Sequence, residues 1–234
     1  MGSNIGLENE SALHAGLKAY LAQPGDLLES PVGGYVVDIV RGDLLIEVQT
    51  RHFGLIRAKL QALLADHPVE LVYPVAAVKW IVQLDPADGH ELGRRRSPKR
   101  GQPADLFDEL VRLPTLLDHP NLTIVVAMTQ EEDVRCADGR GSWRRRGVSL
   151  VERRLLGVDR LVRFRGRADL LALLPTDLEQ PFTARSLARQ MGVRLPQAQR
   201  AAYCLRKLGL ATRAGMAGRA PLYRLVQAAE GEEP

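Results

Sequence analysis

The hydrophobic positions of the first third of the chain switch between helical and strand-like periods. Leu13, Leu17 and Leu21 recur at helical spacing within residues 8–23, and Pro24 ends that predicted helix. A second amphipathic stripe predicts a helix over 53–67, with apolar positions at Leu55, Ile56, Leu60, Leu63 and Leu64. Short apolar runs bounded by turn residues predict strands over 27–32, 35–40, 43–49, 69–75 and 77–82.

The middle of the chain mixes polar segments with one strongly apolar run. Residues 85–103 and 135–147 lack apolar periodicity and are rich in Arg and Gly, which predicts two long polar loops. Residues 122–128 predict a central strand, and 106–117 predict helical pieces broken at Pro114. Residues 150–164 fit either a further strand or a helix.

The last part of the chain reads as three short helices followed by two strand-like pieces. The helices are predicted over 168–174, 184–191 and 197–208, with Thr183 as an N-cap and Gly192 and Gly209 as terminators. The strand-like pieces cover 211–214 and 222–226 and are joined by a Gly-rich turn. This order is the outline of a winged helix-turn-helix.

The order helix, three strands, helix, strand predicts an α/β fold with helices packed on a mixed sheet whose final pair is parallel. We expect one domain over 1–166, a second over 167–227 and an acidic tail over 228–234.

Charge is distributed unevenly along the chain. Residues 1–90 carry 6 Lys and Arg against 11 Asp and Glu, whereas residues 91–226 carry 26 against 14. An acidic first part followed by a basic remainder favours a metal-holding half joined to a polyanion-binding half. The alternative is a general preference for Arg on exposed surfaces.

Composition and cysteine spacing indicate the cellular compartment of the protein. No apolar run approaches the roughly 20 residues that a membrane span needs, and the first residues lack a secretory signal pattern. Cys136 and Cys204 lie far apart without metal-ligand spacing, which disfavours a zinc site or a disulfide framework. We therefore expect a cytoplasmic protein without membrane contact.

Three polar side chains interrupt the apolar strands over 35–40 and 43–49. Glu47 and Gln49 are two residues apart, so on a strand they point to the same face. Asp38 lies on the neighbouring strand, where it is expected to converge with them. Two carboxylates and an amide are costly to bury without a partner, and a divalent metal ion would be such a partner. The alternative is a hairpin whose solvent face carries these residues.

The run from Glu10 to Val75 resembles the core of the PD-(D/E)XK nuclease superfamily, the restriction-endonuclease-like fold, over about a third of the chain. That family has an αβββαβ mixed-sheet core, an acid near the start of its second core strand and an acid-x-Lys motif on its third. Here the first acid matches Asp38, and the acid-x-Lys position is Glu47-Val48-Gln49.

The resemblance implies Mg²⁺, or Mn²⁺, held by Asp38, Glu47 and the carbonyl of Val48. Gln49 departs from the family lysine, because a glutamine can hydrogen-bond a water but brings no positive charge. Glu10 is either a third acid of this site or an acid that stabilises the start of its helix.

A cation from elsewhere in the chain would compensate for the missing lysine. The candidates are Arg51, Lys59 and Lys79. The five histidines show no ligand spacing, and we expect ordinary roles for them.

Basic residues in three segments are candidates for DNA contacts. Clustered Arg and Lys in loops suit phosphate binding, and a helix such as 197–208 could enter a major groove with wing residues at the backbone. The alternatives are a solvated surface for the loops and a protein-binding role for the helix. The candidates are Arg94, Arg95, Arg96, Lys99, Arg100, Arg144, Arg145, Arg146, Arg194, Gln197, Arg200, Lys207, Arg213 and Arg219.

Two functions follow from these interpretations. The first is a Mg²⁺-dependent DNA endonuclease, targeted by its own winged helix, in restriction, repair or defence. It is expected to act as a homodimer or with a partner protein of a larger nuclease system, since one site per chain cuts one strand. The alternative is a DNA-binding regulator that uses a degenerate nuclease fold as a scaffold without cleavage.

Overall fold

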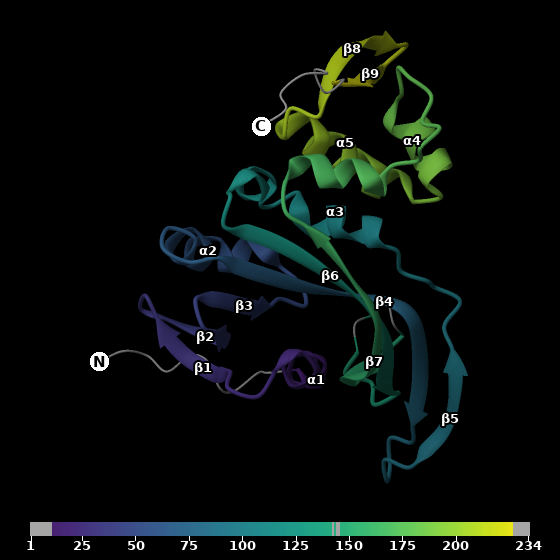
Figure 1. Ribbon diagram of the computed structural model, residues 1–234. Helices are drawn as coiled ribbons and strands as arrows, with labels where there is room; N and C mark the ends of the chain where they lie inside the picture. Colours follow the sequence, from purple (N-terminus) through teal and green to yellow (C-terminus); the bar gives the residue numbers. More distant parts are fainter. Residues whose placement is uncertain (1–10, 142, 144–145, 227–234) are drawn as a thin grey trace.

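A computed structural model describes residues 11–141, 143 and 146–226 (Figure 1). These residues have an α/β fold, as predicted, with seven strands in one mixed sheet and a separate two-stranded hairpin. The sheet strands are β1 (Leu27–Val32), β2 (Tyr35–Arg41), β3 (Leu44–Val48), β4 (Val69–Leu84), β5 (Glu91–Arg96), β6 (Leu122–Cys136) and β7 (Ser149–Phe164). The helices are α1 (Ala12–Leu21), α2 (Arg57–Leu63), α3 (Phe107–Leu110), α4 (Ala184–Met191) and α5 (Leu195–Lys207), and the hairpin is β8 (Ala211–Ala217) with β9 (Ala220–Leu225).

The sheet has the order β1-β2-β3-β4-β6-β7, with β5 beside β4. The β1–β2, β2–β3 and β6–β7 pairs are antiparallel, whereas β3–β4 and β4–β6 are parallel, which confirms the predicted parallel pair after the hairpin. One edge of β4 is shared: β3 pairs with it as far as Val72, and β5 pairs with it from Trp80 onward.

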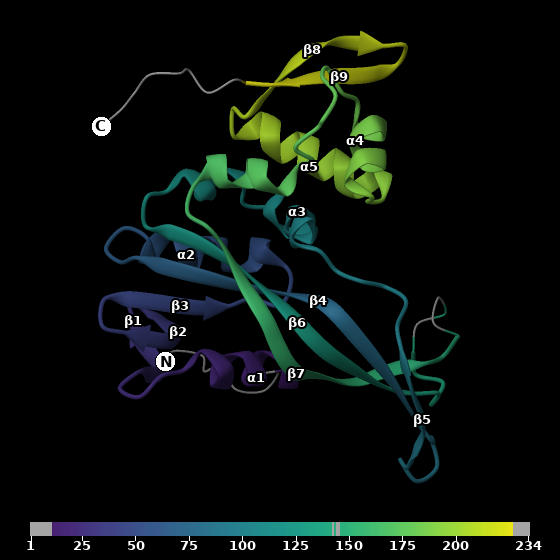
Figure 2. The same ribbon diagram turned by 45° about the vertical axis from the view of Figure 1, so that its right-hand side comes forward.

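Helices α1 and α2 cover opposite faces of the first half of the sheet (Figure 2). Alternation along β3 sends Ile46 toward Leu13 and Leu17 of α1, while Leu45 joins the cluster that includes Leu60 of α2. The side chain of Ser11 caps α1, so the described helix begins later than predicted. A 3₁₀ turn precedes α2, and Leu55, predicted to be apolar core, is exposed because it lies in that turn.

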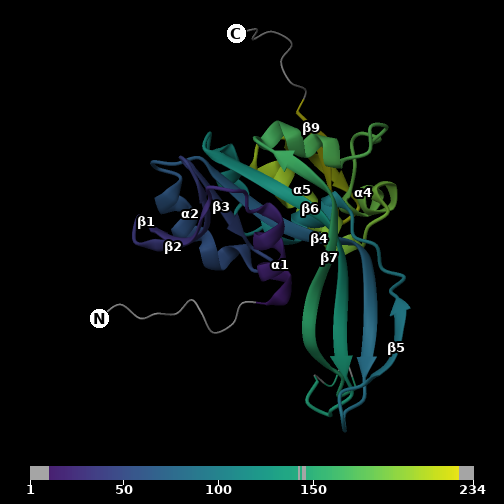
Figure 3. The ribbon, with the colours of Figure 1, turned by 60° about the horizontal axis from the view of Figure 1, so that its bottom comes forward.

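The second half of the sheet is longer than predicted. Instead of two strands over 69–82, β4 is continuous, and β6 runs on to Cys136 beyond its apolar part. Residues 91–96, predicted to be loop, form β5, and the ambiguous segment 150–164 is the strand β7. The four strands extend away from the helices as a lobe (Figure 3), which we call the distal lobe and define as residues 76–97, 129–141, 143 and 146–158.

The C-terminal part stacks on α3 and the helical turns around it (Figures 1 and 2). Thr183 caps α4 and Gly192 ends it in a left-handed conformation, as predicted, whereas 168–174 is 3₁₀ rather than α-helical. Phe182 forms a single antiparallel bridge to Tyr223 of β9. One apolar cluster is continuous from the sheet through α3 to the buried face of α5.

Within the described residues, no helix is long and apolar enough to cross a membrane.

Candidate functional site

The parting of β2 from β3 brings together two of the predicted site residues. The strands remain in register as far as Ile39 opposite Ile46. Asp38 and Glu47 are the next residues on each strand, so their carboxylates are close enough for the charge of Asp38 to raise the pKa of Glu47. The predicted acidic pair therefore converges.

Glu47 is buried, with 4% of its surface exposed. The Nζ of Lys59, on α2, lies 2.5 Å from Glu47 Oε1 and also donates a 2.6 Å hydrogen bond to the carbonyl of Val36. Despite this ion pair, Glu47 Oε1 accepts no hydrogen bond of good geometry from the described residues. Burial raises the pKa of Glu47 to about 7, and the charge of Lys59 limits the rise. A nearby cation stabilises the ionised form of such a buried carboxylate.

Asp38 is held by two donors. Its Oδ2 accepts a 2.8 Å hydrogen bond from the amide of Val48 and lies 3.2 Å from Nε2 of His14 on α1. Burial acts to raise the pKa of Asp38, but His14, the Val48 amide and the charge of Lys59 outweigh burial and lower it. The contact between His14 and Asp38 was not predicted, because no spacing signal links residues so far apart in the chain.

The side chain of Gln49 is hydrogen-bonded to the backbone that follows β3. Its Nε2 donates a 2.5 Å hydrogen bond to the carbonyl of Arg51, and its backbone amide bonds to Val72. The donor group of its side chain is thus engaged by the turn that follows β3. Of the three candidate cations, Lys59 reaches the acidic pair, whereas Lys79 lies in the distal lobe against Glu131.

The donor chemistry of this site fits a hard divalent cation. Asp38 and Glu47 supply carboxylate oxygens, the ligands that Mg²⁺ and Mn²⁺ prefer, and among the described residues Glu47 Oε1 accepts no hydrogen bond of good geometry. Lys59 competes for the same carboxylate. Glu10, the proposed third acid, lies outside the described residues.

The three arginines of β5 do not form the flexible loop cluster that was predicted, because β5 pairs with β4 and alternates its side chains between two faces. Arg94 lies 4.1 Å from the ring centroid of Trp80 and 2.8 Å from Glu132. Arg95 faces the opposite side of the sheet and lines an open pocket. Arg96 is exposed.

Arg194 comes together with Lys99 and Arg100, although it is far from these two neighbours in the sequence. All three line a small pocket between the segment after β5 and the start of α5. Asp105 and Asp108 line it too, so its charge is mixed. Arg146 is exposed at the end of the second Arg/Gly loop, and Arg144 and Arg145 lie outside the described residues.

The first part of the α5 face that was predicted to read bases contacts α3 and the turn before it. Gln197 is 7% exposed, and its Nε2 donates to Asp105 Oδ1 at 2.7 Å and to the carbonyl of Ala104 at 3.2 Å. Arg200 pairs with Asp108 at 2.6 Å. The expectation that Gln197 meets a base edge is therefore corrected, because Gln197 is buried against the turn before α3, whereas Arg200 pairs with Asp108 and remains exposed. Cys204 is buried on the same helix.

A different stripe of α5 is exposed. It contains Tyr203, Arg206 and Lys207, with the ammonium of Lys207 5.9 Å from the Tyr203 ring centroid. Arg213 and Arg219 are also exposed, on the neighbouring hairpin β8–β9. Lys207, Arg213 and Arg219 were among the predicted DNA contacts, whereas Arg206, which is exposed beside Lys207, was not.

A buried network of charges in the distal lobe was not predicted. Lys79 Nζ lies 3.0 Å from Glu131 and 3.5 Å from Asp133, and Arg153 Nε lies 2.8 Å from Asp133. Arg135 completes the network at 2.9 Å from Asp133. Burial acts to raise the pKa of Asp133, but the hydrogen bonds from Arg135 and Arg153 outweigh it and lower the pKa. The acids are therefore neutralised by cations from three strands.

Asp85, Asp88 and His90 form a further group of possible ligands in the turn between β4 and β5. Asp88 Oδ1 lies 2.5 Å from His90 Nδ1 and accepts the backbone amide of His90. These contacts are those of a local turn, and the group is largely exposed.

A family model described as a domain of unknown function (DUF8091) matches residues 11–165. An uncharacterized protein of Treponema pallidum (strain Nichols) is 34% identical over 227 residues, which cover 96% of this chain and 89% of the relative. No solved structure matches the chain.

Proposed function

The chain belongs to the DUF8091 family, and from its own residues we propose that it is a divalent-metal-dependent DNA endonuclease. In this proposal residues 11–75 form a nuclease core of the PD-(D/E)XK type, and the C-terminal part is a winged helix that binds DNA. The protein acts in the cytoplasm, as a homodimer or with a partner protein.

One observation carries the catalytic part of the proposal. Two carboxylates, Asp38 and Glu47, converge where β2 and β3 part, and the Lys59 ammonium lies 2.5 Å from Glu47 Oε1. Two acids with one lysine are the groups that the PD-(D/E)XK signature requires, with the lysine supplied here by a helix in place of Gln49. The order of α1, β1, β2, β3, α2 and β4 also agrees with that core.

Each residue of the site has a separate task. A bound Mg²⁺ or Mn²⁺ would neutralise charge on the phosphate and lower the pKa of a water. Asp38 and Glu47 would hold the ion, and His14 and the Val48 amide fix the orientation of Asp38. Lys59, released from Glu47, supplies positive charge beside the phosphate.

The C-terminal part supports DNA binding through its topology and its exposed cations. A helical turn, a bridge residue, two helices and a hairpin follow one another, and Phe182 pairs with Tyr223 of that hairpin, as the first strand of a winged helix does. Arg206 and Lys207 on the exposed stripe of α5 would reach the groove, with Arg213 and Arg219 at phosphates.

Titration calorimetry with Mn²⁺ tests the metal site. We expect binding by the wild type and its loss in Asp38→Asn and Glu47→Gln. Asp43→Asn, which removes an exposed acid in the β2–β3 turn, is the matched control and should bind as the wild type does. Equal heats in all four proteins would refute the assignment.

Plasmid nicking then separates two functions. We expect nicking with Mg²⁺ or Mn²⁺ by the wild type, and none by Glu47→Gln or Lys59→Met. The alternative, a DNA-binding regulator that does not cleave, is favoured by one observation: the donor group of Gln49 is engaged by Arg51. A gel shift without nicking, in wild type and variants alike, would support that alternative.

A further inference from the structure

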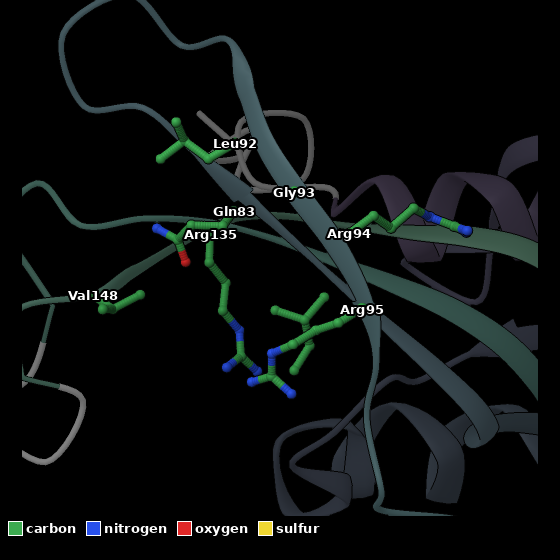
Figure 4. Close-up of a pocket in the computed structure, with 8 residues that line it drawn as sticks. Gln83, Leu92, Gly93, Arg94, Arg95, Arg135 and Val148 are labelled. Carbon is green, nitrogen blue, oxygen red and sulfur yellow. The ribbon is translucent and has the colours of Figure 1, made fainter.

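The distal lobe contains an open pocket of about 680 Å³ on one face of its sheet (Figure 4). Its lining comes from three strands and from the loop before β7. Opposite residues of β4 and β6 form its floor, because Gln83 lies across from Arg135 and both line the pocket. Gly93 leaves one side of the floor open: a Cβ built there meets no atom within 4 Å.

Two guanidinium groups converge in this pocket. Figure 4 shows the side chains of Arg95 and Arg135 directed toward one another across the opening, whereas Arg94 points away from them. Arg135 is anchored by its 2.9 Å contact with Asp133. No ion pair of Arg95 occurs among the residues that the structure describes. Like charges converge at a cost, which a bound anion would remove.

The charges on this face do not balance. Glu131 and Asp133 are the two buried acids of the face, and they share Lys79, Arg135 and Arg153. Among the residues that the structure describes, three cations contact these two acids, and Arg95 adds a further positive charge. Arg95 and Arg135, which both line the pocket, therefore favour an anionic ligand.

The remaining lining indicates the body of the ligand. Ile81, Leu92 and Val148 are apolar walls, and Gln83 offers an amide. A volume of about 680 Å³ is in the range of small-molecule sites, roughly 300–1,000 Å³, and is far larger than a bare phosphate needs. Arginine forks match phosphate oxygens in pairs, and a phosphate monoester carries about two negative charges at neutral pH.

We propose that this pocket binds the phosphate monoester of a nucleotide-sized molecule, with Arg95 and Arg135 on the phosphate and the apolar walls on the organic body. The phosphate can come from a free mononucleotide or from the 5′-phosphorylated end of a nucleic acid. The site is separate from Asp38 and Glu47 and needs no metal ion, so it stands or falls independently of the nuclease proposal.

Calorimetry in the presence of EDTA tests this site without the metal-dependent one. The probes are AMP, adenosine and inorganic phosphate. We expect AMP to bind the wild type at least tenfold more tightly than either fragment, because the fragments each lack half of the contacts. A 5′-phosphorylated oligonucleotide and its 5′-hydroxyl counterpart identify the source: tighter binding of the phosphorylated strand than of AMP assigns the site to nucleic-acid ends, and weaker binding assigns it to free nucleotides.

Three variants make the test specific. Arg95→Gln should weaken AMP binding at least tenfold and leave the melting temperature unchanged, because Arg95 is exposed. Gly93→Leu should abolish binding by filling the floor while keeping both charges. Arg96→Gln, the same change one residue along on the opposite face, should bind AMP as the wild type does.

Three results would overturn the proposal. They are no binding of AMP to the wild type, equal affinity for AMP and adenosine, and equal weakening by Arg95→Gln and Arg96→Gln.

Discussion

Replacing Glu47 by glutamine should change how the stability of the protein depends on pH. In the folded protein, burial raises the pKa of Glu47 from its ordinary 4.5 to about 7. Between these values the folded state keeps the proton and the unfolded state loses it. The contribution of Glu47 is therefore fully present below pH 4.5 and is lost as the pH rises through about 7.

The size of this loss follows from the two pKa values. Each pH unit between them corresponds to about 1.4 kcal/mol, so the free energy of unfolding should fall by ~3 kcal/mol as Glu47 ionises. The substituted side chain in the Glu47→Gln variant cannot ionise, so the unfolding free energy of the variant should not fall in this way. Asp38 has a lowered pKa and is ionised throughout the window, so it adds no slope there.

Urea unfolding at pH 4.5, 5.5, 6.5 and 7.5, followed by circular dichroism, measures the effect. The difference in unfolding free energy between wild type and Glu47→Gln should move in favour of the variant by ~3 kcal/mol across this range. In Lys59→Met, the pH-dependent loss of stability should occur at higher pH than in the wild type, because the charge of Lys59 lowers the pKa of Glu47. Parallel curves for wild type and Glu47→Gln would refute the assignment of Glu47 as a buried, perturbed acid.

Two further predictions concern stability. Gly101→Ala should cost about 1–3 kcal/mol in thermal or urea unfolding, because its Cβ would lie 2.6 Å from Val75 Cγ1 and 2.7 Å from the carbonyl oxygen of Ala76; a wild-type melting curve would contradict this close approach. Gln197→Ala should cost about 1–3 kcal/mol, because it leaves Asp105 Oδ1 and the carbonyl of Ala104 without their donor. The control Gln199→Ala, at an exposed position of α5, should stay within roughly 0.5 kcal/mol, and equal losses in both variants would contradict the docking of α5.

The parts of the fold that could be predicted are those with local signals. Thr183 and Gly192 mark the ends of α4 because capping needs only the nearest backbone groups. The pair Asp38 and Glu47 could be found because a short turn joins their strands, so alternation fixes where each lies.

The rest depends on partners that are distant in the chain. The second half of β6 carries Glu131 and Asp133, which lie beyond the apolar run that predicted a strand and are neutralised by Lys79 and Arg153 from other strands. His14 reaches Asp38 only through the packing of α1 on the sheet. Gln197 is polar and lies on a helix that suits DNA, and only the docking of α5 on α3 shows that it is buried. Periodicity predicts which face of a helix or strand carries a residue, but it does not predict which other element packs on that face.

The continuous apolar cluster also bears on how the chain folds during synthesis. Phe107 and Leu110 of α3 are fully buried in a cluster that includes Ala198, Ala201 and Leu205 of α5. A chain leaves the ribosome at about 5–20 residues per second, so α3 emerges several seconds before its cover. Over that interval the apolar side chains of α3 face solvent or a chaperone, and the core closes only when nearly the whole protein has been made.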